Sequence, residues 1–219
     1  MSKIGILGGT FNPIHLGHTL PAKEVAEHLS LDKVLLIPAN IPPHKATPNI
    51  SAHHRSSMVK LACSDEPIFI CDERELKRNS YSYTIDTLKE LSLSNPSDQL
   101  YFIMGLDSLL TFTSWYKYQD ILSKCHLIVN TRPNYQLDKL NKSTLSLLQR
   151  HQVDNISTLE KMKHGGIYIL TDILANNSGR LNINLSSTEL RQRLINNQCC
   201  ETLLSQKVLD YINKNKLYR

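Results

Sequence analysis

The sequence predicts an α/β fold with a doubly wound, mostly parallel β-sheet and a helical part at the C-terminal end. Short apolar runs alternate along the chain with segments whose apolar residues recur at helical spacing. Several runs are apolar at consecutive positions, as in strands buried on both faces of a parallel sheet. Two runs end in glycine followed by polar residues, at Gly8-Gly9 and at Gly105. Because ligands of such sheets bind beyond the carboxyl ends of the strands, we expect these two ends to form the walls of one cleft.

Six strands are expected, each where a short apolar run is bounded by polar residues, glycine or proline. In chain order they are Ile4–Leu7, Lys33–Ile37, Ile68–Cys71, Leu100–Met104, His126–Val129 and Ile167–Leu170. Between the second strand and the next helix, a loop from Pro38 to about Ala52 holds four prolines.

The segments between the strands carry the period of amphipathic helices. The residues expected to face the core are Ala22, Val25, Ala26 and Leu29 in the first helix, Met58, Leu61 and Ala62 in the second, and Ile85, Leu88 and Leu91 in the third, over Thr84–Leu93. Short helices are expected at Ser108–Phe112 and Tyr116–Ser123, and residues 136–163 look helical and rather polar.

The C-terminal part has a different character. Ser186 and Glu189 have the spacing of a capping box at the start of a helix. A final helix is predicted from Leu204, Val208, Tyr211 and Ile212. We therefore expect a single domain, with an α/β core over 1–184 and C-terminal helices over 185–219.

The bulk composition excludes several classes of protein. A length of 219 residues suits one α/β domain, and the net charge of +5 comes from scattered Lys and Arg, without the basic stripe typical of a nucleic-acid binder. Five scattered cysteines argue against a disulfide framework or a structural zinc site. No secretory signal and no membrane-spanning run is seen, so a cytoplasmic protein without membrane or nucleic-acid partners is expected.

The most informative stretch is GGTFNPIHLGH, residues 8–18, where the first strand passes into the first helix. Its glycines allow a tight turn and a close approach of a ligand to the backbone. His15 and His18 fall at the helix N-terminus, where backbone N–H groups and the helix dipole favour phosphate. By itself, this histidine pair is also compatible with a surface pair or half of a metal site. The whole string, however, resembles the (H/T)xGH nucleotidyltransferase superfamily, which has a Rossmann-like fold.

A second helix start carries hydroxyls and a cation, in Ser186-Ser187-Thr188 followed by Arg191. An ordinary helix cap with a surface arginine is the simpler interpretation, but the same groups can hold an anion. The segment resembles the ISSTxIR motif of that superfamily, with Leu185 and Leu190 in place of isoleucines. Together, the N-termini of the two helices can bind one triphosphate.

Four further elements resemble one family of that superfamily, the bacterial nicotinate-nucleotide adenylyltransferases. They are Pro42-Pro43-His44-Lys45, the SYTIDTL stretch of residues 82–88, Gly105-Leu106-Asp107-Ser108 ahead of the single tryptophan Trp115, and Arg132-Pro133-Asn134-Tyr135. The chain departs from the family pattern at Asn12, where Asp is usual, at Tyr118, where a second aromatic such as Trp is expected, and at Asn134, which replaces Gly. The resemblance is weak only over about 136–165.

The resemblance implies adenylyl transfer from ATP to nicotinate mononucleotide, giving deamido-NAD and pyrophosphate, with Mg²⁺ carried by ATP. The residues implied for ATP are Gly8, Gly9, Thr10, Phe11, His15, Gly17, His18, Ser187, Thr188 and Arg191. Those implied for the mononucleotide are Asn12, Lys45, Tyr83, Thr84, Asp107, Trp115, Tyr116 and Arg132. The catalytic charges are assigned to His15, His18, Lys45 and Arg191.

Each aromatic or acidic residue in that set also has a plainer interpretation. Trp115 can stack on a pyridine ring or pack in the core. Asp107 can accept from a ribose hydroxyl or cap the helix that follows it. Among the alternatives for the whole chain, the same transfer to nicotinamide mononucleotide is the hardest to exclude, while the Ser82–Leu88 stretch and Trp115 argue against phosphopantetheine. An RNA binder is disfavoured because no basic stripe is present, and a non-catalytic nucleotide sensor is disfavoured because both histidines, Lys45 and Arg191 are retained. The sequence leaves open whether the protein is a homo-oligomer.

Overall fold

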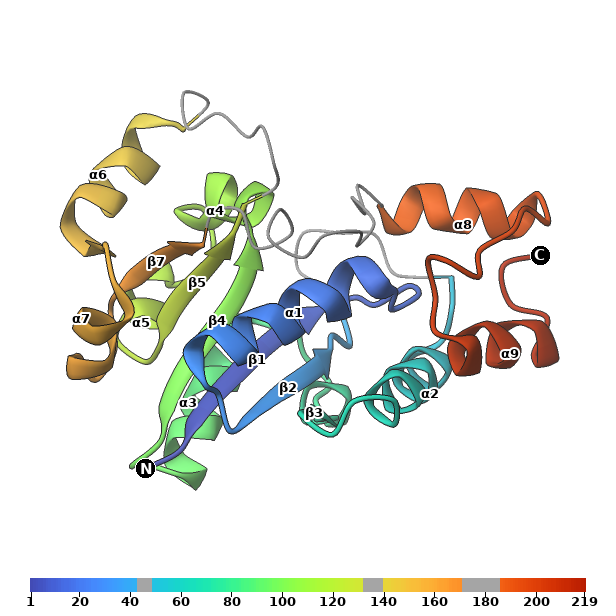
Figure 1. Ribbon diagram of the computed structural model, residues 1–219, viewed down its shortest axis with the longest axis horizontal. Helices are drawn as coiled ribbons and strands as arrows, with labels where there is room; N and C mark the ends of the chain where they lie inside the picture. The colour runs from blue at the N-terminus through green and yellow to red at the C-terminus, as the bar shows by residue number, and fades with distance from the viewer. Residues whose placement is uncertain (43–48, 132–139, 171–185) are drawn as a thin grey trace.

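The structure is a computed structural model that describes residues 1–42, 49–131, 140–170 and 186–219 (Figure 1). Its centre is a seven-stranded sheet in the order β3-β2-β1-β4-β5-β7-β6, and every neighbouring pair of strands is parallel. The strands are β1 (Lys3–Gly9), β2 (Lys33–Pro38), β3 (Phe69–Cys71), β4 (Gln99–Gly105), β5 (His126–Asn130), β6 (Gln152–Val153) and β7 (Ile167–Leu170). This confirms the predicted α/β fold, and the order runs outward in both directions from the β1–β4 pair.

Helices connect the strands and cover both faces of the sheet. They are α1 (Leu16–Leu29), α2 (Ala52–Cys63), the 3₁₀ turn η1 (Glu75–Lys77), α3 (Thr84–Ser94), α4 (Leu106–Phe112), α5 (Tyr118–Leu122), α6 (Lys142–His151), α7 (Ile156–Lys161), α8 (Ser187–Ile195) and α9 (Gln206–Lys214). No helix among these described residues is long and apolar enough to cross a membrane.

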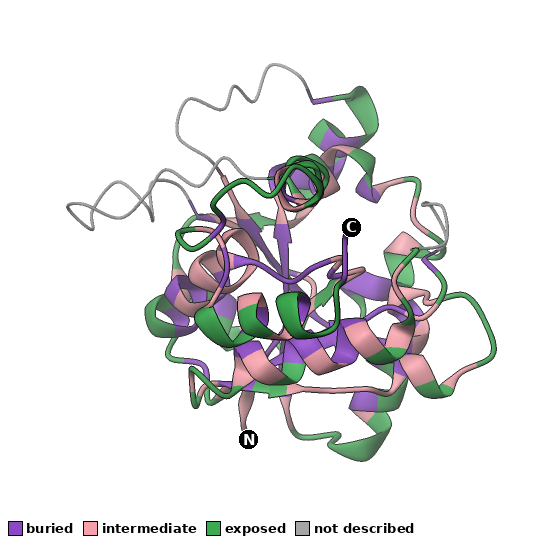
Figure 2. Cartoon of the chain, turned by 90° about the vertical axis from the view of Figure 1, so that its right-hand side faces the viewer, coloured by how far each residue is buried: buried purple, intermediate pink, exposed green. Residues whose placement is uncertain are grey.

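The alternation of side chains along the strands divides the core in two. Leu36 and Ile103 face one cluster, which contains the buried faces of α1, α2 and α9. Their neighbours Leu35 and Phe102 face the other cluster, which is filled by α3, α4 and α5. Because each central strand is apolar on both faces, its sequence is a continuous apolar run. Figure 2 shows this buried interior between the exposed outer surfaces of the helices.

Where the helical period of the sequence is strong, it predicts the buried face of the helix correctly. Ala22, Val25, Ala26 and Leu29 are all buried in α1. The three apolar residues expected in α3 are also buried: Ile85, Leu88 and Leu91. These side chains hold the first turns of both helices at the carboxyl end of the sheet, where the cleft is expected.

Two predictions about the middle of the chain are wrong. Within the stretch expected to be helical from 136 to 163, α6 and α7 are separated by β6, a two-residue strand that pairs with β7 at the sheet edge. Two residues carry no readable period, which is why the strand was missed. The helix expected over Tyr116–Ser123 is shorter, because Lys117 adopts a left-handed backbone at φ 52° and α5 begins only after it.

The C-terminal helices lie beside the N-terminal half of the sheet. Helix α9 packs against α2, and the His54 ring hydrogen-bonds to the Tyr211 hydroxyl at 2.9 Å. The backbone N–H of Leu16 donates to the carbonyl of Leu203 at 2.9 Å, which ties the start of α1 to the segment before α9. Figure 1 shows α8 and α9 on the side of the molecule opposite α6 and α7. The C-terminal segment therefore lies close enough to contribute residues to the site formed by β1 and α1.

Candidate active site

The carboxyl ends of the central strands form the floor of the candidate site. Gly9, the last residue of β1, is in register with Pro38 at the end of β2, and Gly105 at the end of β4 is in register with Asn130 of β5. The N–H of Ala39 donates to the carbonyl of Gly9 at 2.9 Å and extends this pairing past the strands. Because β1 and β4 are direct neighbours, with residues paired from Lys3 and Gln99 to Ile6 and Phe102, the two glycine ends expected to flank one cleft lie at the same edge of the sheet.

One side of this edge is the histidine wall, which we define as residues 8–18 together with the first turn of α8. The backbone reverses at Phe11, which has a φ of 47°. His15 is the N-cap of α1 and is buried, and its ring lies 3.8 Å from that of His18 between centroids. The two histidines therefore act as one packed pair at the helix start.

The hydrogen bonding of His18 fixes which of its ring nitrogens carries the proton. The backbone N–H of His15 donates to Nδ1 of His18 at 3.3 Å. A nitrogen that accepts a hydrogen bond has no proton, so the neutral His18 ring carries its proton on Nε2. The edge-on Phe11 ring, 5.2 Å away and at 89°, holds the imidazole in its plane. The result is an oriented donor at the N-terminal end of a helix.

The start of α8 meets the start of α1, although 172 residues separate them in sequence. The side chains of His15 and Ser187 lie 3.1 Å apart, from Nε2 to Oγ. Arg191 donates through Nη1 to the carbonyl of Asn12 at 2.9 Å and through Nη2 to the Thr188 hydroxyl at 3.1 Å. The pairing of two helix starts expected from the sequence is thus present. It brings two histidines, two hydroxyls and a guanidinium together.

The cap of α8 has only half of the predicted capping box. The Ser186 hydroxyl accepts from the backbone N–H of Glu189 at 3.1 Å, as predicted. The Glu189 carboxylate instead pairs with Arg193 at 2.8 Å, one turn further along the helix. Leu185, the apolar residue before this cap, lies outside the described residues.

Arg55 and Tyr218 support the histidine wall, and neither was predicted from the sequence. Arg55, on α2, is 1% exposed and donates to the carbonyls of Thr10 at 2.8 Å and Ala39 at 2.6 Å. Burial lowers the pKa of its guanidinium. The Tyr218 hydroxyl donates to Oδ1 of Asn12 at 2.7 Å, and burial raises its pKa. A spacing pattern could not reveal these residues, because their partners are backbone carbonyls or residues far along the chain.

The two glycines of the turn have different surroundings. A Cβ added to Gly9 would lie 2.9 Å from the nearest atom of the Phe11 ring, so this glycine gives Phe11 its place against the strand end. A Cβ added to Gly8 would meet only the Phe102 ring, at 3.9 Å, which is ordinary contact. Gly9 is therefore needed by the packing of the wall itself. Gly8 leaves an open backbone surface.

A second group of residues near this edge is the aromatic wall, which we define as residues 81–84 and 115–116. The rings of Tyr83 and Tyr116 lie 4.6 Å apart between centroids, and both side chains were expected in one subsite. Trp115 is half-buried and packs on Phe112 at 5.5 Å and edge-on to Phe102 at 6.0 Å. Both interpretations of Trp115 therefore have support, since its ring is anchored in the core but not fully covered.

Thr84 and Asp107 begin the two helices that flank this wall. Thr84 is the first residue of α3, and the N-cap position before it is held by Tyr83 without a side-chain cap. Asp107 is in the first turn of α4 and is exposed, while Gly105 holds the N-cap position. The alternative of Asp107 as the helix cap is therefore wrong. Its carboxylate folds back over Gly105, where a Cβ would lie 2.6 Å from Oδ1.

The structure brings most of the expected site residues to one edge of the sheet, although it does not place all of them. Asn12, in the histidine wall, makes its contacts with the supporting residues Tyr218 and Arg191 and not with the aromatic wall. Lys45 and Arg132, expected to bind phosphate and mononucleotide, lie outside the described residues, as does His44.

The chain is similar in sequence to known proteins. A family model described as Cytidylyltransferase-like matches residues 6–193. A curated protein of Aeromonas hydrophila, named "Probable nicotinate-nucleotide adenylyltransferase", is 45% identical over 216 residues, which cover 99% of this chain and 97% of that protein. An Escherichia coli protein named "Nicotinate-nucleotide adenylyltransferase" is 43% identical over 215 residues, with 98% and 97% coverage.

Solved structures of similar fold come from Plasmodium falciparum. A nicotinic acid mononucleotide adenylyltransferase complexed with APC superimposes with a TM-score of 0.72 at 19% identity, covering 100% of this chain and 98% of that one. The same enzyme complexed with NaAD gives a TM-score of 0.71 at 21% identity, with the same coverage. At these identities the likeness concerns the fold.

Proposed function

The chain belongs to the nicotinate-nucleotide adenylyltransferase family, and we propose that it transfers the adenylyl group of ATP to nicotinate mononucleotide in NAD biosynthesis. A phosphate oxygen of the mononucleotide attacks the α-phosphorus of ATP, and the bond from that phosphorus to the bridging oxygen breaks. Deamido-NAD and pyrophosphate leave, and no covalent enzyme intermediate forms. Such a transfer depends mainly on positioning and on stabilising charge.

The observation that carries this proposal is the junction of the two helix starts. His15 and Ser187 bring α1 and α8 to one place, and Arg191 bridges from α8 to the turn after β1. Three kinds of phosphate donor converge there: imidazole, hydroxyl and guanidinium. In our proposal, His15, Ser187, Thr188 and Arg191 hold the triphosphate of ATP. Nε2 of His18 donates to the α-phosphate, where negative charge grows in the transition state.

We assign the acceptor nucleotide to the aromatic wall. A pyridine ring stacks on flat aromatic side chains, which Tyr83, Trp115 and Tyr116 provide. A nicotinate carboxylate needs donors, and the uncapped N-terminus of α3 at Thr84 has backbone N–H groups and the positive end of a helix dipole. Asp107, exposed beside the end of β4, is assigned to the ribose hydroxyls. Lys45 and Arg132 remain proposed phosphate and mononucleotide ligands.

The proposed metal is Mg²⁺ that arrives with ATP. Among the described residues, no group of three or more His, Cys, Asp or Glu side chains is placed to hold a metal ion. The donor set therefore fits an ion coordinated mainly by phosphate oxygens and water. When bound, the ion neutralises charge on the phosphates. All five cysteines are free thiols, which supports our proposal of a reducing, cytoplasmic location.

Pyrophosphate release from MgATP tests the proposal, with nicotinate mononucleotide, nicotinamide mononucleotide and phosphopantetheine supplied in parallel as acceptors. We expect rapid release with nicotinate mononucleotide. We also expect strong discrimination against the nicotinamide form, because a site that hydrogen-bonds a polar group discriminates by about 10⁴-fold against an analogue that lacks it. Equal use of the two pyridine nucleotides would keep the reaction and refute the carboxylate site at α3. No release with any acceptor would refute the proposed reaction.

A further inference from the structure

A buried carboxylate lies directly behind the aromatic wall. Glu75, in the 3₁₀ turn η1 between β3 and α3, is only 6% exposed. Burial raises the pKa of its carboxyl group, and hydrogen bonds from Thr87 and Ser82 oppose that shift. A buried carboxylate is costly unless hydrogen bonds compensate for its lost hydration, so its position calls for a structural or functional explanation.

Glu75 interacts with residues on both sides of the segment that forms the wall. The Thr87 hydroxyl donates to its Oε1 at 2.6 Å from the first turn of α3, and Thr87 is itself buried. The Ser82 side chain, a hydrogen-bonding neighbour, lowers the pKa of the Glu75 carboxyl. Tyr83 and Thr84 lie between these two partners in sequence. Glu75 therefore fixes both ends of the short segment that carries Tyr83 and the N-terminus of α3.

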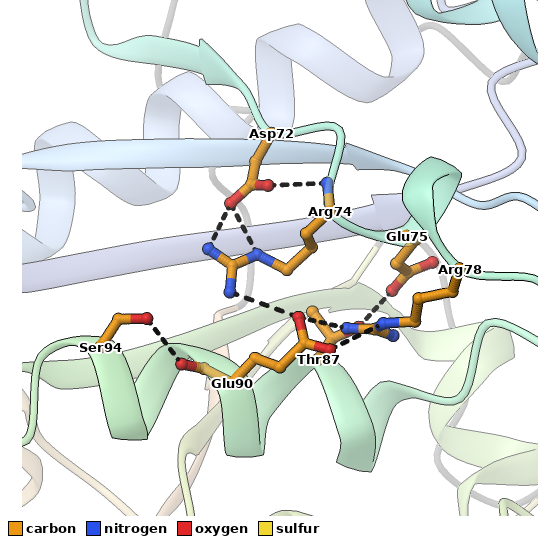
Figure 3. Close-up of polar contacts among 7 residues, drawn as sticks. All are labelled: Asp72, Arg74, Glu75, Arg78, Thr87, Glu90 and Ser94. Atoms are coloured by element: carbon orange, nitrogen blue, oxygen red, sulfur yellow. Dashed lines mark hydrogen bonds and ion pairs between the residues drawn. The ribbon is translucent and has the colours of Figure 1, made fainter.

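A second layer of charge surrounds this bond, as Figure 3 shows. Arg78 donates to the Thr87 hydroxyl at 3.0 Å and pairs with Glu90 at 2.7 Å. Arg74 pairs with Asp72 at 2.7 Å and reaches Glu90 at 3.7 Å. The Thr87 hydroxyl thus accepts a hydrogen bond from Arg78 and donates one to Glu75, so its hydrogen points toward the Glu75 carboxylate.

The same network reaches the floor of the cleft through Asn40. The Asn40 backbone N–H donates to the Ser82 hydroxyl at 2.9 Å, and its Nδ2 donates to the Arg78 carbonyl at 2.7 Å. Asn40 follows the end of β2, where its own carbonyl accepts from Arg55 at 3.4 Å. The Ser82 hydroxyl, like that of Thr87, accepts one hydrogen bond and must donate its hydrogen elsewhere. For Thr87 that acceptor is Glu75, at 2.6 Å, and the Ser82 side chain also interacts with the Glu75 carboxylate.

We propose that Glu75 is a positioning residue for the mononucleotide subsite, which accepts the Thr87 hydroxyl hydrogen, interacts with the Ser82 side chain and so fixes Tyr83 and the start of α3 against the nicotinate ring. This inference rests on the proposed function and deepens it. Glu75 touches no substrate and acts through Ser82 and Thr87. A glutamine cannot replace it, because an amide offers one acceptor oxygen and one donor group. One of the two hydroxyls then faces a donor while already accepting a hydrogen bond.

Two-substrate steady-state kinetics on Glu75→Gln tests the inference. We expect the KM for nicotinate mononucleotide to rise about tenfold, because a hydrogen bond to a charged group is lost. The KM for ATP and the kcat at saturation should stay within about twofold of the wild type, because the histidine wall has its own supports. Glu75→Asp, which restores the charge, should recover part of the affinity.

The matched control is Glu90→Gln, which removes a carboxylate from the outer layer of the same network, where the side chain is 46% exposed. It should leave both KM values unchanged. If Glu75→Gln does not fold, Thr87→Val removes the hydroxyl that donates to Glu75. It should raise the KM for nicotinate mononucleotide selectively, and Thr87→Ser, which keeps the hydroxyl, is its control.

Other outcomes overturn the inference. Equal changes in both KM values, or a lower melting temperature with unchanged kinetics, would reduce Glu75 to a general stabilising residue. A wild-type protein that is inactive with nicotinate mononucleotide would refute the proposed function instead. In that case the inference about the mononucleotide subsite falls with it, and the wild-type assay identifies which of the two failed.

Discussion

The histidine wall and the aromatic wall are held in place in different ways. The histidine wall depends on residues far away in sequence: Arg55 from α2, Arg191 from α8 and Tyr218 from the chain end. The aromatic wall is held mainly by its own neighbourhood, since Glu75 and Thr87 are 12 positions apart and Arg78 and Thr87 are nine apart. The first wall is therefore assembled only when the whole chain is folded, while the second is largely a local unit. Substitutions that affect only one of the two walls should accordingly change the use of one substrate and not of the other.

The largest effect is expected at the histidine wall, at the residue that faces the reacting phosphate. His18→Ala should lower kcat by about 10²–10³-fold, because a donor oriented toward growing charge is removed. The KM for ATP should change little, since the other triphosphate contacts remain. Steady-state kinetics measures both constants, and His28→Ala, at the last turn of the same helix, is the control. A loss of ATP affinity with turnover intact would instead indicate a nucleotide sensor.

The next effect tests the long-range support of the same wall. In Arg55→Lys, a single ammonium on a shorter side chain replaces a guanidinium whose Nη1 donates to the carbonyls of Thr10 and Ala39 and whose Nη2 donates to that of Asn40, so at least one carbonyl loses its donor. We expect the KM for ATP to rise about tenfold, with the KM for the mononucleotide unchanged. Glu75→Gln is expected to give the opposite pattern, with a raised KM for the mononucleotide and an unchanged KM for ATP. Lys60→Arg, an exposed cation change on the same helix, is the control. A change confined to the mononucleotide would contradict the division between the walls.

A smaller effect distinguishes the two glycines of the turn. Gly9→Ala places a methyl group 2.9 Å from the Phe11 ring and should shift Phe11 away from His18. We expect a loss of about 1–3 kcal/mol in unfolding free energy, together with a lower kcat. Gly8→Ala should keep the stability and raise only the KM for ATP, because its methyl group occupies the surface left for the ligand. Urea unfolding and kinetics on the same two variants check this, and equal destabilisation by both would contradict it.

The smallest effect on catalysis is expected outside both walls, at the amino end of the sheet. His126, the first residue of β5, is fully buried, and its Nδ1 accepts from the Gly166 N–H at 3.2 Å while Nε2 lies 3.1 Å from the Met162 carbonyl. Burial lowers its pKa to about 4, so the fold requires the neutral ring. The unfolded state binds the proton more readily, and stability is therefore complete above about pH 6.5 and falls as the pH decreases toward 4.

This titration gives a measurable loss of stability without a change in the cleft. On going from pH 7 to pH 5, the His126 contribution to the unfolding free energy should fall on the order of 2 kcal/mol. In His126→Gln that contribution should be absent, and the KM values at pH 7 should match those of the wild type. Chemical denaturation at both pH values tests it. An equal pH dependence in the variant would assign the titration to another group.

Much of this arrangement was predictable from sequence because it is locally encoded. The turn after β1, the buried faces of α1 and α3 and the cap at Ser186 all depend on residues within a few positions of one another. Arg55, Tyr218 and Glu75 were not predictable, since each is defined by partners that only tertiary structure brings near. The interruption of the polar helical stretch by β6 was missed for the same reason, because two residues pair with β7 and carry no period of their own.

The most direct test of the account is a crystal structure of the protein with deamido-NAD bound. We predict that the pyrophosphate lies at the junction of α1 and α8, within hydrogen-bonding distance of His18. We also predict that the nicotinate ring stacks against the Tyr83, Trp115 and Tyr116 side chains, with its carboxylate at the start of α3. A nicotinate ring bound away from the aromatic wall, or a pyrophosphate away from the two helix starts, would contradict it.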